Sequence, residues 1–147
     1  MRVYLDACCL SRLTDDQKQP RVRAEAEAVE HIMGMIRAGH STWVSSTVLT
    51  IEVSRNPDQE RRRDAQALLL FASEVVVPNQ EVAGRAEEIE KHGFSAFDAL
   101  HLASAEQAGA DVFLTTDDVL LRRAGLKTAR LRLRVENPVS WYREVQP

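Results

Sequence analysis

Short apolar runs alternate along this chain with longer segments in which apolar residues recur every three or four positions. The short runs predict five buried or half-buried strands, over residues 2–6, 42–45, 74–77, 112–115 and 131–135. The periodic segments predict helices over residues 20–38, the segment that carries Glu52, and residues 59–72, 80–93, 95–108 and 117–124. Strands that alternate with helices are typical of a mainly parallel sheet covered on both faces.

The first predicted helix has the clearest pattern. Pro20 is suited to its first turn and Gly39 to its end, and Glu25 is among the polar residues expected to face away from the core. Its buried side is predicted to consist of Val22, Ala26, Val29, Met33 and Ile36. With 147 residues and no repeat or linker, the chain is expected to form one α/β domain over residues 1–147.

Composition excludes several classes of function. The net charge of −3 argues against binding nucleic acid through the charge of the whole molecule, although a local basic surface would still allow it. No apolar run approaches the roughly 20 residues of a membrane span, and the N-terminal run is too short for a signal peptide. Cys8 and Cys9 are adjacent, which disfavours a disulfide between them. Free thiols indicate a cytoplasmic protein, and the lack of a long apolar run indicates one without a membrane partner.

Four carboxylates stand where a core would favour apolar side chains. Asp6 ends an apolar run, Glu52 lies between Ile51 and Val53, and the other two are Asp98 and Asp117. A buried carboxylate without a partner costs several kcal/mol or binds a proton. Asp6 and Asp117 also fall at the carboxyl ends of predicted parallel strands, where ligands bind in such folds. The pattern indicates a divalent cation site.

Structural explanations compete with this interpretation. Asp98 forms a capping box with Ser95, Asp117 and Asp118 favour the first turn of a helix, and Arg55 is the cation nearest to Glu52 in sequence. If the four acids converge, however, like charges about 4 Å apart repel by about 4 kcal/mol at an effective dielectric constant near 20. That exceeds any capping gain. Oxygen ligands suit Mg²⁺ or Mn²⁺, and four negative charges match two such ions.

Four segments carry a resemblance to a known family. They are Tyr4 to Leu10, Glu52 with the following Ser54 and Arg55, Phe97 to Ala103, and Leu114 to Asp117. Because of these four segments, the chain resembles the PIN domain family of metal-dependent ribonucleases, which includes the VapC-type toxins. The resemblance implies a three-layer α/β/α sandwich with a mainly parallel sheet of about five strands. It also implies one or two Mg²⁺ or Mn²⁺ ions, a cognate antitoxin, a homodimer, and an acidic quartet of Asp6, Glu52, Asp98 and Asp117.

The same segments hold further candidates. After its first aspartate the family often has hydroxyl or amide residues, whereas this chain has Ala7 and Cys8. Thr115 is a candidate for orienting water or phosphate, and a structural hydroxyl is the alternative. Asp118 is either a fifth acid or a helix-start residue. His101 is either a support for the ligands or a structural histidine.

Basic residues provide candidate contacts to RNA or to a protein partner. Arg12 follows Asp6 closely and Arg55 lies one turn from Glu52. Arg130, Arg132 and Arg134 alternate with apolar residues, which predicts one basic row on a half-buried strand. The alternative is an edge strand that is protected from aggregation by charge.

We therefore expect a Mg²⁺- or Mn²⁺-dependent endoribonuclease, the toxin of a toxin–antitoxin pair. One alternative is a catalytically silent PIN-fold binding module. A second is a receiver-like phosphoacceptor domain, which would need an acid beside Asp6 and an aspartate at the end of the third strand, where Val77 and Pro78 stand instead.

Overall fold

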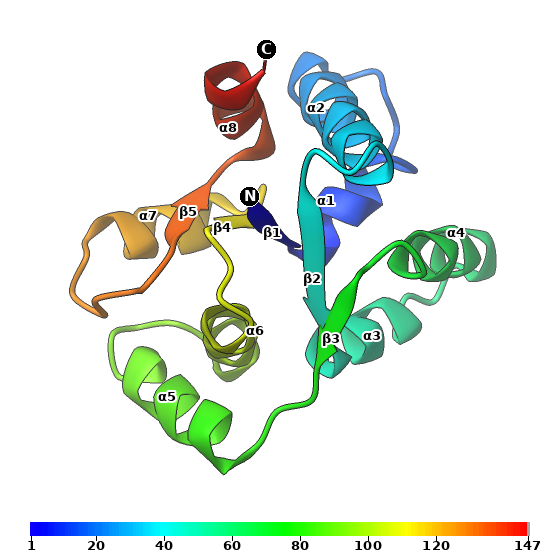
Figure 1. Ribbon diagram of the computed structural model, residues 1–147. Coiled ribbons are helices and arrows are strands. Elements are labelled where there is room, and N and C mark those ends of the chain that lie inside the picture. Colours follow the sequence, from blue (N-terminus) through cyan, green and yellow to red (C-terminus); the bar gives the residue numbers. More distant parts are fainter. Residues whose placement is uncertain (147) are drawn as a thin grey trace.

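Five parallel strands form one sheet in the computed structural model, which describes residues 1–146 (Figure 1). The strands are β1 (Arg2–Leu5), β2 (Thr42–Ser46), β3 (Glu74–Val76), β4 (Val112–Leu114) and β5 (Arg134–Glu136), in the order β3-β2-β1-β4-β5. All four neighbouring pairs are parallel. The predicted α/β sandwich and its five strands are confirmed.

Alternating side chains divide the core between the two faces of the sheet. Val3 and Leu5 of β1 belong to one buried cluster, whereas Tyr4 belongs to the other. The first cluster lies against α1 (Ala7–Arg12), α2 (Pro20–Arg37), α3 (Thr47–Ser54), α4 (Gln59–Leu69) and α8 (Pro138–Val145). The second lies against α5 (Gln80–Glu90), α6 (Ala96–Gln107) and α7 (Asp118–Gly125). This is the period-two arrangement of a sheet buried on both faces.

The strand order places a change of direction at the centre of the sheet. From β1 the chain moves outward through β2 to β3, and then returns to the other side of β1 to form β4 and β5. Asp6 directly follows β1, and its backbone N–H donates to Leu114 O at the end of β4, at 2.9 Å. The carboxyl ends of β1 and β4 therefore meet at the point where this class of sheet binds ligands.

The last predicted strand is shorter than expected. Residues 131–133 are not part of β5. Directly before them, Arg85 donates to the carbonyl oxygens of Ala129 and Arg130. Glu106 also accepts from Arg132 N, at 2.8 Å. These bonds hold a loop in which Lys127 and Arg130 have positive φ angles of 60° and 49°. The prediction of one basic row on a strand was therefore wrong.

Two helices were not predicted from the apolar pattern. Both begin at residues whose side chains accept from the backbone: Asp6 caps α1, and Asn137, followed by Pro138, caps α8. Each is short, so neither has enough turns to produce a visible periodicity. The cap and the proline are the signals that would have located α8.

Glu25 is buried, which corrects the expectation that it faces away from the core. Its side chain is 2% exposed and bonds to Arg12, Arg21 and Asn137. The Arg12 Nε–Glu25 Oε1 distance is 2.9 Å and the Asn137 Nδ2–Glu25 Oε2 distance is 2.6 Å. The network joins α1, α2 and the start of α8. Within the described residues, no helix is both long and apolar enough to cross a membrane.

Candidate metal centre

Asp6 and Thr115 join the ends of the two central strands. Asp6 is 6% exposed and caps α1, with Ala7 N donating to its Oδ1 at 2.9 Å. Thr115, which is fully buried, donates to Asp6 Oδ2 at 2.9 Å and accepts from Asp117 N at 3.1 Å. Both carboxylate oxygens are therefore fixed by groups that belong to strand ends and helix starts.

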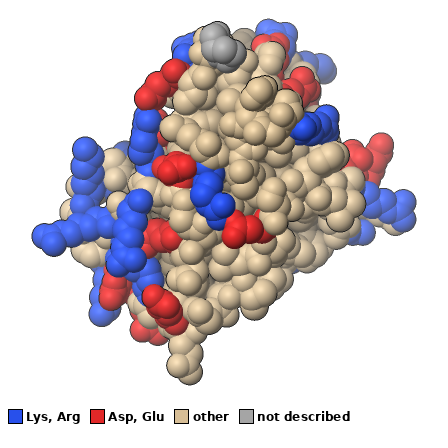
Figure 2. Space-filling view, viewed as in Figure 1, with Lys and Arg blue, Asp and Glu red and all other residues tan. Residues whose placement is uncertain are grey.

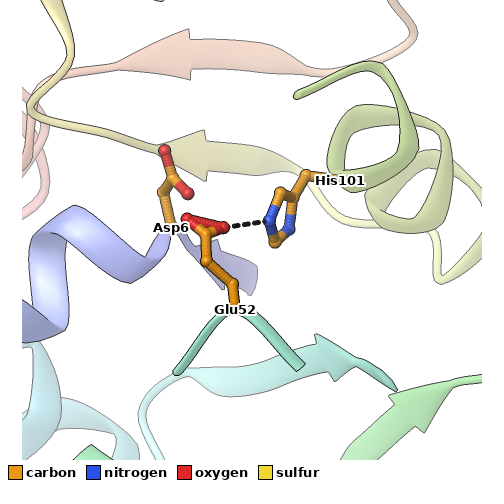
Figure 3. Close-up of side chains that lie close together, drawn as sticks. All are labelled: Asp6, Glu52 and His101. Atoms are coloured by element: carbon orange, nitrogen blue, oxygen red, sulfur yellow. Dashed lines mark hydrogen bonds and ion pairs between the residues drawn. The ribbon is translucent and has the colours of Figure 1, made fainter. Parts of the chain in front are cut away.

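Two further side chains, from separate helices, converge on Asp6. Asp6, Glu52 and His101 each offer a ligand atom, and these atoms lie within 4.8 Å of one another (Figure 3). Glu52 comes from α3 and His101 from α6, and His101 Nε2 lies 2.7 Å from Glu52 Oε2. His101 is fully buried and its Nδ1 lies 2.6 Å from Tyr4 Oη. The histidine therefore lies in direct contact with one of the predicted acids.

Asp98 and Asp117 lie close to this trio but outside it. Ser95 Oγ accepts from Asp98 N at 3.1 Å, so Ser95 provides the cap of α6. Partial burial raises the pKa of Asp98, a hydrogen bond with Ser95 lowers it, and the charges of Asp117 and Glu52 raise it again. Asp117 Oδ1 caps α7 by accepting from Val119 N and Leu120 N, so Asp117 is the cap of this helix and not, as expected, a residue of its first turn. The capping bonds of Asp117 thus use only one of its oxygens.

Burial is the dominant electrostatic feature of Asp6. It raises the pKa of that carboxyl well above the usual range, and the nearby Cys8 and Glu52 add to this effect. The Thr115 hydrogen bond lowers the pKa and Asp98 raises it. Within residues 1–146, no lysine or arginine forms an ion pair with Asp6, Glu52, Asp98 or Asp117. Within the described part of the chain, the carboxylates of this group therefore have no lysine or arginine partner.

Cys8 takes part in the contacts around Asp6. Its Sγ lies 3.3 Å from Thr115 Oγ1 and 3.5 Å from Asp6 Oδ2, and it accepts from Thr116 N at 3.3 Å. A hydrogen bond with Cys9 lowers the pKa of the Cys8 thiol, burial raises it, and the contacts with Thr115 and Thr116 lower it again, to about 5. Cys8 and Cys9 are both free thiols, as predicted.

Two surface hollows border the acids. One, of about 360 Å³, is lined by Cys8, Glu52 and Arg55 among others. The other, of about 320 Å³, has Asp98 and Arg123 in its lining. Arg123 was not a predicted candidate, and its guanidinium occupies the space that a Cβ would fill at Gly93. Gly93 has a φ of +93°, a conformation that favours glycine. The glycine at this position is the feature of the sequence that could have indicated the close approach of Arg123.

Several predicted candidates have structural partners instead. Asp118 is paired with Arg21, whose guanidinium lowers the pKa of Asp118. This geometry fits the helix-start interpretation of Asp118 and not that of a fifth acid. Arg12 lies in ion pairs with Asp15 and Glu25, so its guanidinium is engaged in holding α1 to α2. Arg55 is exposed and lies over the ring of Phe97, 5.6 Å from the ring centroid.

The basic residues near β5 lie at the other end of the sheet from the acids. Arg134 pairs in register with Val112, the first residue of β4, whereas Asp117 follows the last residue of that strand. Arg134 is also engaged with Glu136 and Glu144. Figure 2 shows basic side chains gathered over α7 and the segment that leads to β5. Arg130 and Arg132 are exposed there, but they do not border the acidic group as the sequence pattern suggested.

Comparisons with known proteins agree with this architecture. The fold is similar to that of a chain in the crystal structure of VapBC2 from Rickettsia felis bound to a DNA fragment from their promoter. That likeness has a TM-score of 0.62 and 16% identity, and covers 93% of this chain and 98% of that chain. VapBC-1 from nontypeable Haemophilus influenzae gives a TM-score of 0.59 and 16% identity, and covers 94% of this chain and 98% of that chain.

At this identity the two structures establish the fold alone. No curated protein matches the chain. The family model described as PIN domain matches residues 3–126, which span β1 to β4 and include Asp6, Glu52, Asp98 and Asp117. The chain belongs to the PIN domain family.

Proposed function

We propose that this protein is a metal-dependent endoribonuclease in which Asp6, Glu52, Asp98 and Asp117 hold one or two Mg²⁺ or Mn²⁺ ions. One observation carries the proposal. The buried carboxylate of Asp6 faces Glu52, with ligand atoms within 4.8 Å, and no lysine or arginine within residues 1–146 pairs with either. Two carboxylates at about this distance repel by about 3–4 kcal/mol at an effective dielectric constant near 20. A bound cation removes that repulsion.

The donor set fits a hard divalent cation. The four acids offer carboxylate oxygens, and Mg²⁺ and Mn²⁺ take oxygen ligands while keeping several waters. His101 Nε2 is engaged with Glu52 Oε2, so the histidine supports a ligand and does not replace one. Asp98 and Asp117 are more exposed than Asp6 and are available to hold an ion on its solvent side.

The residues of this chain have separable roles in phosphodiester hydrolysis. A divalent cation at these carboxylates would lower the pKa of a water and neutralise charge on the scissile phosphate. Ala7 N and Thr115 hold both oxygens of Asp6 in fixed positions. Arg55 and Arg123, in the two hollows beside the acids, offset the negative charge of the RNA backbone.

The proposed partner is an antitoxin. This rests on the similar folds found in two VapBC structures, and on the chain's membership of the PIN domain family. A homodimer is proposed on the same ground. The receiver-like alternative is not retained, because that fold has the strand order 2-1-3-4-5, whereas here β4 and not β3 lies beside β1.

Adjacent aspartates provide the test. Asp117→Asn removes a charge from the acidic group but keeps a good helix cap, whereas Asp118→Asn removes a charge that pairs with Arg21. Cleavage of a labelled RNA in saturating Mn²⁺ is expected to fall by about 100-fold or more in Asp117→Asn, and to stay within about twofold in Asp118→Asn. Asp98→Asn is expected to behave like Asp117→Asn. Cleavage by Asp98→Asn at the wild-type rate would remove Asp98 from the mechanism.

The catalytically silent PIN module is the second candidate. It predicts that the protein folds and binds a partner without using Mn²⁺. A calorimetric titration that detects no Mn²⁺ binding to the wild-type protein would favour this alternative over the nuclease.

A further inference from the structure

We propose that Tyr4 and Ser46 are positioning residues that act on Glu52 through His101. In this inference the two hydroxyls fix the proton of His101 on Nε2, and that N–H in turn holds Glu52 toward Asp6. The inference rests on the proposed metal site, because it assigns a task to residues behind one of the carboxylates. None of the three supporting residues is itself proposed to touch the metal or the RNA.

The contacts form one unbranched chain of short hydrogen bonds. Ser46 Oγ lies 2.6 Å from Tyr4 Oη, Tyr4 Oη lies 2.6 Å from His101 Nδ1, and His101 Nε2 lies 2.7 Å from Glu52 Oε2. Ser46, Tyr4 and His101 have no exposed surface. The chain thus starts inside the protein and ends at a carboxylate that is partly open to solvent.

The hydrogen bond at the Ser46 end of this chain determines which group donates in each of the other bonds. Leu49 N donates to Ser46 Oγ at 3.2 Å, so the serine oxygen accepts at this end. The serine hydroxyl then donates to Tyr4 Oη, and the tyrosine hydroxyl donates to His101 Nδ1. His101 must therefore accept at Nδ1 and carry its hydrogen on Nε2, from which it donates to Glu52.

The reverse direction leaves a buried donor without a partner. If His101 Nδ1 donated to Tyr4, the tyrosine hydroxyl would donate to Ser46 Oγ, which already accepts from Leu49 N. The serine hydrogen would then have no acceptor among the described residues, because the hydrogen bonds of Ser46 Oγ are with Tyr4 and Leu49 alone. A buried unsatisfied donor is costly, so the forward direction is the stable one.

Aromatic packing holds the rings in this arrangement. The ring of Tyr4 stacks on Phe113, with centroids 5.1 Å apart and planes 10° apart, and meets His101 edge-on at 5.8 Å. Phe97 covers His101 from another side, at 5.5 Å between centroids. Neither ring can turn without displacing core side chains. The hydrogen bond to Glu52 Oε2 is therefore directed by the core of the protein (Figure 3).

Residues that hydrogen-bond to a metal ligand, without binding the metal themselves, affect metal affinity. Residues that orient a metal ligand commonly change the affinity by 10–100-fold when they are mutated. Here a change at Tyr4 would affect the bound ion through two intervening side chains, His101 and Glu52. We therefore expect Tyr4→Phe, which removes only the hydroxyl, to weaken Mn²⁺ binding by about tenfold.

The first experiment needs neither metal nor activity. Long-range ¹H–¹⁵N correlation spectra of the metal-free wild-type protein at pH 7 report which ring nitrogen of each histidine carries hydrogen. The signals of His101 are assigned in the wild-type protein itself, from nuclear Overhauser contacts between its ring and the rings of Tyr4 and Phe97. We expect hydrogen on Nε2 alone. Hydrogen on Nδ1, alone or in addition to Nε2, would overturn the inference, and this outcome does not depend on any variant that must fold.

The second experiment separates positioning from stability. Calorimetric Mn²⁺ titrations compare wild type with Tyr4→Phe and with Tyr142→Phe, which alters the other tyrosine, stacked on His31 at 4.9 Å. We expect the dissociation constant to rise about tenfold in Tyr4→Phe and to stay unchanged in Tyr142→Phe. A Tyr4→Phe protein that melts earlier but binds Mn²⁺ as tightly as wild type would overturn the inference while leaving the proposed metal site intact. A wild-type protein that binds no Mn²⁺ would overturn the proposed function and the positioning role together.

Discussion

The Thr115 hydroxyl lies 2.9 Å from Asp6 Oδ2 and links the ends of β4 and β1 across the centre of the sheet. Thr115 has no exposed surface, so this bond is shielded from water. It is also the contact that counteracts the effect of burial on the pKa of Asp6. The sequence alone offered both a catalytic and a structural role for Thr115, and the geometry connects it directly to the carboxylate.

Replacing Thr115 is expected to affect the ionisation of Asp6. Thr115→Val keeps the shape of the side chain but removes the donor, so the pKa of Asp6 should rise further and the carboxylate should bind Mn²⁺ about 10-fold less tightly. Calorimetric titration at pH 7 measures the change. Thr115→Ser, which keeps the hydroxyl, is the matched control and should bind within about twofold of wild type. Equal losses in both variants would contradict the role of the hydroxyl.

Asp6→Asn is expected to stabilise the metal-free protein near neutral pH. Because the folded-state pKa of Asp6 is raised, the folded protein binds more protons than the unfolded chain above the unfolded pKa of about 4. The stability of the wild type therefore falls relative to the variant as the pH rises from about 4 toward the raised pKa. Loss of the buried charge and loss of the repulsion from Glu52 both contribute to the gain, and the repulsion alone is at most about 3–4 kcal/mol.

Urea denaturation in EDTA measures this difference at pH 3.5 and at pH 7.5. The two proteins should be nearly equal at the lower pH, and the variant should be as stable or more stable at the higher pH. Destabilisation of Asp6→Asn at pH 7.5 would mean that Asp6 is structurally paired and not held ready for a cation.

Bound Mn²⁺ should stabilise the folded protein through the same carboxylates. At a free concentration 100 times the dissociation constant, the gain is about 2.7 kcal/mol. For a protein of this size that corresponds to a rise in Tm of about 5–10 °C. Thermal melts with and without Mn²⁺ should show this shift in wild type and Asp118→Asn but not in Asp98→Asn. A full shift in Asp98→Asn would remove that residue from the ion's ligands.

Two arginines close to the acids in sequence should behave differently. Arg12→Gln leaves the buried Glu25 with fewer partners and is expected to lower the free energy of unfolding by about 2–3 kcal/mol, with little effect on RNA affinity. Arg55→Gln should leave stability nearly unchanged. It should reduce the slope of log affinity against log salt concentration for single-stranded RNA by about 0.7, as expected for one lost phosphate contact.

Fluorescence anisotropy with a labelled RNA and urea denaturation together separate these outcomes. Arg130→Gln is the matched surface control, since Arg130 lies at the opposite end of the sheet. Its salt slope should equal that of the wild type. An equal reduction in Arg55→Gln and Arg130→Gln would indicate a diffuse electrostatic effect and not a contact beside the acidic group.

The apolar pattern was sufficient for the strands and for most of the helices. Val3 and Leu5 fall on one face of β1 and Tyr4 on the other, which is the local consequence of strand geometry and can be seen in any such run. It failed at α1 and α8, which are too short for periodicity. It also failed at residues 131–133, where a bond from Arg132 N to Glu106 and one from Arg85 to the preceding Arg130 override the local alternation. Those contacts come from α5 and α6, far away in sequence.

The sequence by itself determined the kind of fold and the chemistry of the four acids, because strand and helix periods and unpaired carboxylates are local properties of the chain. Only the tertiary structure decided which groups meet. It brought His101 to Glu52, paired Asp118 and Arg12 with other residues, and placed Arg130 and Arg132 at the far end of the sheet. Distances between α3, α6 and the strand ends depend on how helices pack across a sheet, and no local pattern of residues encodes that packing.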